Sequence, residues 1–92
     1  MKENYLDDIL RRVQEETLDY IMKLVKFEEL IDVNISLSFE GGTLNVDVQV
    51  LLHEASTKNP TEIARKAAQY AIDVFDKLWR KKHEDNEHVE AH

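Results

Sequence analysis

The fold is decided by residues 31–52, which read IDVNISLSFEGGTLNVDVQVLL. Over residues 31–39 every odd-numbered residue is apolar and every even-numbered one is polar. On the return, over residues 44–52, the even-numbered residues are apolar, and Asn45, Asp47 and Gln49 alternate with them. A period of two is typical of strands with one buried face. The intervening Gly41-Gly42 suits a two-residue turn with positive φ at both positions, so the stretch predicts a β-hairpin.

The register of this hairpin follows from the length of its loop. A two-residue loop pairs Glu40 with Thr43, and apolar residues then face apolar residues in every second pair: Phe39 with Leu44, Leu37 with Val46, Ile35 with Val48, Val33 with Val50, and Ile31 with Leu52. A shift by one residue would set polar side chains against apolar ones along the whole ladder, so the pattern favours this register.

Helices are predicted on both sides of the hairpin. Apolar residues spaced three and four apart predict a first helix from about Tyr5 to Glu28, with Asn4 as its cap. After a linker at 53–59, a second helix is predicted from Pro60 to about Lys82. Asn59 at the cap and Glu62 three residues later form a capping box.

These elements predict an α+β fold of the order α-β-β-α, with both helices on the apolar face of the sheet. Residues 1–82 would form the single domain, and the polar residues 83–92 a disordered tail. A lone two-stranded sheet is marginally stable and leaves two unpaired edges. We therefore expect dimerisation, with itself or with a paralogous small subunit, to extend the sheet.

Composition narrows the class of protein. The chain has 92 residues and no cysteine, and no run approaches the roughly 18 apolar residues of a membrane span. The start lacks the profile of a signal peptide, so we expect a cytoplasmic protein with no membrane partner. The formal net charge of -7 disfavours direct contact with nucleic-acid phosphates.

The sequence also lacks catalytic motifs. Its two glycines are both used in the hairpin turn, cysteine is absent, and no Ser, His and acid cluster stands out. We predict neither an enzyme nor a cofactor. His83, His88 and His92 lie among acids in the tail and are the type of side chain that binds zinc or nickel, but we expect a solvated tail and no metal site.

Two sets of residues are candidates for protein contact. The polar hairpin face is either an open, solvated surface or a docking face for a partner, and it consists of Asn34, Ser36, Ser38, Asn45, Asp47 and Gln49. Tyr70 and Trp79 are either core residues at helical spacing or aromatic anchors of an interface.

An RNA-binding module is the alternative. Lys58, Arg65 and Lys66 cluster at the start of the second helix, where double-stranded-RNA-binding domains contact phosphates. Those domains have the order α-β-β-β-α, whereas this chain lacks the third strand, has a longer first helix and is acidic.

In order and length the whole chain resembles a small archaeal family of uncharacterised proteins encoded near the prefoldin β subunit. Residues Ile31 to Leu78 are also similar to the small paired subunit of KEOPS, the complex that makes threonylcarbamoyladenosine on tRNA. The likeness lies in the hairpin SLSFEGGTLNVDV at 36–48 and the helix segment AAQYAIDV at 67–74. It implies a non-catalytic scaffold subunit that dimerises and supports a kinase-like enzyme. The KEOPS subunit opens with a strand, which this chain lacks, so the resemblance assigns no individual residues.

Overall fold

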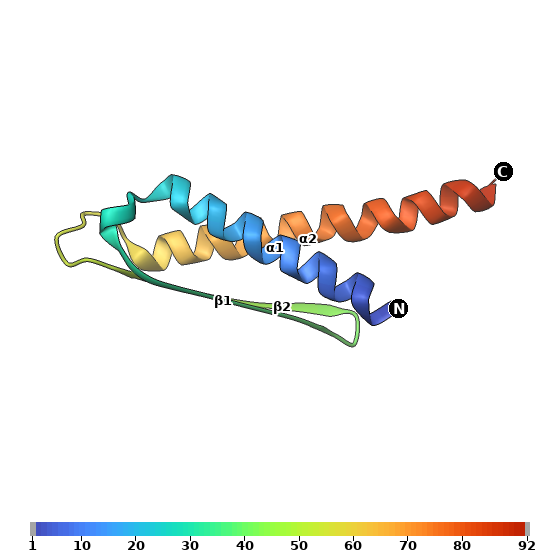
Figure 1. The fold of residues 1–92 in the computed structure, drawn as a ribbon, viewed down its shortest axis with the longest axis horizontal. Coiled ribbons are helices and arrows are strands. Elements are labelled where there is room, and N and C mark those ends of the chain that lie inside the picture. Colours follow the sequence, from blue (N-terminus) through green and yellow to red (C-terminus); the bar gives the residue numbers. More distant parts are fainter. Residues whose placement is uncertain (1, 92) are drawn as a thin grey trace.

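The computed structural model describes the backbone of residues 2–91 and the side chains of residues 5–80. In order, the elements are α1 (Lys2–Leu24), the 3-10 helix η1 (Phe27–Glu29), β1 (Leu30–Glu40), β2 (Thr43–Leu52) and α2 (Pro60–Ala91). The strands form a two-stranded antiparallel sheet, and both helices lie on one of its faces (Figure 1). The predicted α+β class and the α-β-β-α order are confirmed.

The hairpin has the predicted register over most of its length. Every pair from Val33–Val50 to Glu40–Thr43 is present. Gly41 and Gly42 have φ angles of 57° and 79°, as a two-residue type I′ turn requires.

The predicted pairing of Ile31 with Leu52 is wrong. Leu30 lies opposite Leu52 and Asp32 opposite Leu51, so Ile31 is an extra residue in a β-bulge. Leu30 takes the inward position against the core, and the side chain of Ile31 is 57% exposed. The bulge was hidden in the sequence because Leu30 and Ile31 are both apolar.

The bounds of α1 also differ from the prediction. The helix begins at Lys2, so Asn4 lies within it and is not its cap, and it ends at Leu24 rather than near Glu28. Lys26 is extended, and its backbone N–H donates to the Glu29 carboxylate at 2.8 Å. This side-chain acceptor replaces the next helical carbonyl and turns the chain through η1 into β1.

The start of α2 is confirmed and its end is not. The Asn59 side-chain oxygen accepts hydrogen bonds from the backbone N–H groups of Thr61 and Glu62, at 2.9 and 3.2 Å. The helix continues to Ala91, past the end expected near Lys82, because residues 83–91 contain neither Pro nor Gly. The division into a domain at 1–82 and a tail at 83–92 stays a prediction.

The core lies between the helices and the sheet in two adjoining clusters. The first contains Ile21, Val25, Ile35, Leu52, Ile63 and Ala67, and the second Ile9, Val13, Ala71 and Phe75. Tyr70 stacks on Tyr20 with ring centroids 4.3 Å apart, and Trp79 lies 5.1 Å from Phe39. Both candidate anchors therefore pack within the chain. The inward-facing valines of β2 are only half-buried, so the helices cover this face incompletely.

Candidate interaction surface

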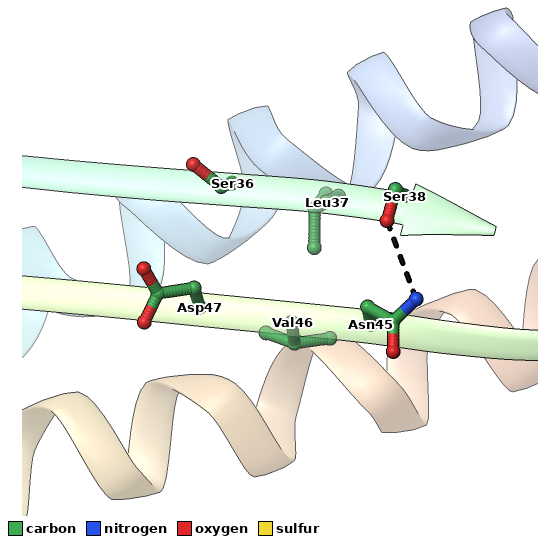
Figure 2. A pocket seen from close by; sticks show the side chains of 6 residues that line it. All are labelled: Ser36, Leu37, Ser38, Asn45, Val46 and Asp47. Atoms are coloured by element: carbon green, nitrogen blue, oxygen red, sulfur yellow. Dashed lines mark hydrogen bonds between the residues drawn. The ribbon is translucent and has the colours of Figure 1, made fainter.

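The six polar residues predicted as a docking face do lie together. Asn34, Ser36 and Ser38 on β1 stand directly opposite Gln49, Asp47 and Asn45 on β2. We call this set the outer face, since it is the side of the sheet that the helices leave open. Figure 2 shows four of its members, with both helices passing behind the strands. All six side chains are exposed or half-exposed.

Side-chain contacts within the outer face are weak. Asn45 Nδ2 donates to Ser38 Oγ at 3.4 Å, a long hydrogen bond that joins the strands (Figure 2). Two shallow hollows of about 210 and 310 Å³ lie along the face, one around Ser36 and Asp47 and one around Asn34 and Gln49. Both are open to solvent, whereas small-molecule sites bury most of their ligand. The shape suits the surface of a second protein better than a small ligand.

The charged side chains of the hairpin are all acidic. Residues 30–52 include Asp32, Glu40 and Asp47 and contain no Lys or Arg. Such a surface repels phosphates and is complementary to hydrogen-bond donors and cationic side chains.

An apolar margin, which the sequence reasoning missed, adjoins the outer face at the end away from the turn. Leu51 is 55% exposed opposite Asp32, and the bulge turns the neighbouring Ile31 outward. Phe27 in η1, just before β1, is 79% exposed. A signal was present for Leu51, whose odd number places it on the polar side of β2. Apolar side chains beside uncharged polar ones are typical of protein interfaces.

The three cations of the RNA-binding alternative are largely engaged with acids. Lys58 Nζ lies 2.9 Å from Glu29 Oε1, and Arg65 lies 3.9 Å from Glu62 Oε2. Lys66 is exposed on α2. Two of the three positive charges therefore have carboxylate partners, which weakens the RNA-binding hypothesis.

Glu29 is the centre of a hydrogen-bonded network at the same end of the hairpin as the apolar margin, away from the turn. Besides Lys26 and Lys58, its carboxylate accepts a hydrogen bond from Ser56 Oγ at 3.0 Å. The hydrogen bond from the Lys26 backbone, followed by that from Lys58, lowers the pKa of Glu29 to about 2. A carboxylate with so low a pKa is a poor general base at neutral pH.

His53 does not activate Ser56 in this network. The His53 Nδ1 atom accepts a hydrogen bond from the backbone N–H of Ala55 at 3.2 Å, while the Ser56 hydroxyl donates to Glu29. The arrangement joins η1 to the loop before α2.

Metal binding and membrane insertion find no support in the described part of the chain. Among the side chains of residues 5–80, no three from His, Asp and Glu gather as metal ligands would. His83, His88 and His92 lie outside these side chains. Neither helix, as far as the structure describes it, has a stretch long and apolar enough to cross a bilayer.

Comparison with known proteins gave no relative. No protein-family model, curated protein or solved structure matches the chain. A functional assignment therefore depends on the surface itself.

Proposed function

We propose that this chain is a non-catalytic cytoplasmic subunit that dimerises and acts by protein–protein contact, with the outer face as its docking surface for a larger partner. The observation that supports this most is the open outer face, on which six polar side chains lie beside the exposed Ile31 and Leu51. The helices of the chain cover the opposite side of the sheet (Figure 1).

The chemistry of the surface supports a protein partner. Ser, Asn and Gln side chains both donate and accept hydrogen bonds, and they cost less to desolvate than charged groups. The apolar margin supplies area whose burial stabilises a complex by roughly 25 cal/mol per Å². The resemblance to the KEOPS subunit suggests the partner class, namely the subunits of a complex that modifies tRNA.

The test compares variants in affinity capture from a nuclease-treated native lysate, read by mass spectrometry. Ser36→Arg and Gln49→Arg place a long cation on the outer face, and Gln69→Arg makes the matched change on the exposed side of α2. We expect wild type and Gln69→Arg to recover KEOPS subunits, and the two outer-face variants to lose at least tenfold of that signal. All four should have similar melting temperatures.

Equal recovery by Ser36→Arg, Gln49→Arg and wild type would exclude the outer face as the docking surface. Recovery without any KEOPS subunit would exclude the assignment to that complex.

A further inference from the structure

The two edges of the sheet can be distinguished from the hairpin geometry. In a two-residue hairpin the residues that flank the loop form a hydrogen-bonded pair, and such pairs then alternate with non-hydrogen-bonded ones. Glu40–Thr43 is the first hydrogen-bonded pair, so Val33–Val50, Ile35–Val48 and Leu37–Val46 are non-hydrogen-bonded pairs. Residues of these latter pairs direct their backbone N–H and C=O groups outward, to the free edges.

The edge of β1 is obstructed in two places. Gln14 Nε2 on α1 donates to the backbone carbonyl of Ile35 at 2.9 Å, at one of these outward-directed groups. The bulge at Ile31 interrupts the same strand. A covering side chain and a bulge both prevent a strand edge from pairing with another chain.

The edge of β2 is open. Its ten residues, Thr43–Leu52, include no proline and no lysine. On β1 the Gln14 side chain hydrogen-bonds an outward-directed carbonyl. Among the described residues, no side chain does the same for the outward-directed N–H and C=O groups of Val46, Val48 and Val50. The side chains of these valines are half-buried, so a neighbour could cover them further.

Helix α2, which packs on β2, carries a row of small and apolar side chains. Helix α2 packs on β2 while α1 packs on β1, and Tyr70 of α2 stacks on Tyr20 of α1. Ala64, Ala68 and Ile72 recur every four residues and so form a row along a flank of α2 that does not include Tyr70. Ile72 is 42% exposed.

We infer that a second copy of this chain pairs with the open edge of β2. The two β2 strands run antiparallel about a two-fold axis at Val48, and two two-stranded sheets become one sheet of four strands. This inference deepens the proposed function and rests on its dimerising role, since it names the partner, the edge and the register.

The position of the two-fold axis follows from which residues of β2 can lie opposite each other in the two copies. The outward-directed backbone N–H and C=O groups of one β2 strand must face those of the other. The two strands can therefore shift relative to each other only by two residues at a time, which keeps the apolar faces of both sheets on the same side. An axis at Asp47 opposes two carboxylates, which is unfavourable. An axis at Gln49 shortens the overlap. An axis at Val48 sets Asp47 opposite Gln49, Val46 opposite Val50 and Leu44 opposite Leu52.

The first experiment measures the mass of the purified chain by light scattering over a range of micromolar concentrations. We expect twice the 10.8 kDa of one chain. A monomer at every concentration overturns the inference. It leaves the outer face untouched as a site for other proteins, which the Ser36→Arg comparison tests separately.

The second experiment tests the register by disulfide formation. The chain has no native cysteine, so only the introduced thiols can form a disulfide. Asp47→Cys and Gln49→Cys are oxidised separately and as a mixture. Residues directly opposed in a non-hydrogen-bonded pair have Cα atoms about 4.5 Å apart, within disulfide reach, whereas diagonal neighbours lie about 7–8 Å apart. We expect the mixture to form the mixed disulfide at least tenfold faster than either variant alone. Faster linkage in Asp47→Cys alone, or none in the mixture, overturns the register.

The third experiment tests the edge with a matched pair of proline variants. Val33 and Val50 are cross-strand partners, both half-buried, and each directs its N–H to its own free edge. Proline at either removes an outward donor and spares the hairpin ladder. We expect Val50→Pro to dissociate the dimer at a concentration where Val33→Pro remains dimeric, with similar circular dichroism for both. The opposite order, or an equal effect, overturns the assignment to β2.

Discussion

At the scale of single residues, Thr17 presents a buried polar group. Its side chain is fully buried in α1, and its hydroxyl has no hydrogen-bond partner among the described residues. Thr17→Val replaces the hydroxyl with a methyl group of similar volume, so we expect the free energy of unfolding to rise by about 1 kcal/mol. Urea denaturation measures the change, and Thr17→Ser, which instead removes the methyl group, should lower stability. A loss of stability in Thr17→Val would show that the hydroxyl bonds to its own helix.

The low pKa of Glu29 predicts how the stability of the fold depends on pH. Its pKa of about 2 lies below the ordinary 4.5, so the folded state favours the ionised carboxylate. This stabilisation is complete above about pH 4.5 and is lost as the pH falls toward 2. Glu29→Gln should therefore lower the melting temperature at pH 7, and the difference from wild type should shrink below pH 4.5. Glu28→Gln in the same turn is the control, and equal effects of the two variants would contradict the network.

At the scale of elements, the hairpin turn depends on conformation alone. A Cβ atom at Gly41 or Gly42 would meet nothing within 4 Å, so a substitution there is limited only by the positive φ angles. Gly41→Asn should be nearly neutral because asparagine adopts the left-handed region readily, whereas Gly41→Val should cost about 1–2 kcal/mol. Chemical denaturation of the two variants measures the difference, and similar stabilities would contradict the type I′ turn.

The helices and strands also show how much of the fold could be predicted from the sequence. Alternation and the Gly41-Gly42 turn determined the hairpin register because a slip by one residue would expose every apolar side chain. The Asn59 cap could also be predicted, because it depends only on residues that are close in sequence. The bulge at Ile31 and the end of α1 at Leu24 depend instead on which of several apolar residues the core accepts, and on the Glu29 side chain replacing a helical acceptor.

For the candidate surface, alternation placed the six polar residues together in advance. The apolar margin at Ile31 follows from the bulge, so it could not be predicted without the tertiary packing. Nor could the obstruction of one sheet edge by Gln14, since that contact joins residues from different elements.

At the scale of the whole molecule, the described core ends well before the end of α2, and Leu78 and Trp79 pack against its last members. Its buried members extend from Ile9 to Phe75. Removing residues 83–92 should therefore change the melting temperature by no more than about 2 °C, well below the 4–8 °C typical of a loss of about 1 kcal/mol in a domain this small. Differential scanning calorimetry of the shortened chain measures this. A larger drop would show that the end of α2 contributes to the fold, and would contradict the boundary at Lys82.

The aromatic cluster around Trp79 has a practical consequence. This tryptophan, the only one in the chain, contacts Phe39 on β1 and Phe75 on α2, and stacks on Tyr5 near the start of α1. Its ring joins three elements that are far apart in sequence, so it reaches this environment only when they dock. The protein thus contains its own fluorophore, whose emission would time long-range docking in a stopped-flow refolding trace without any added dye.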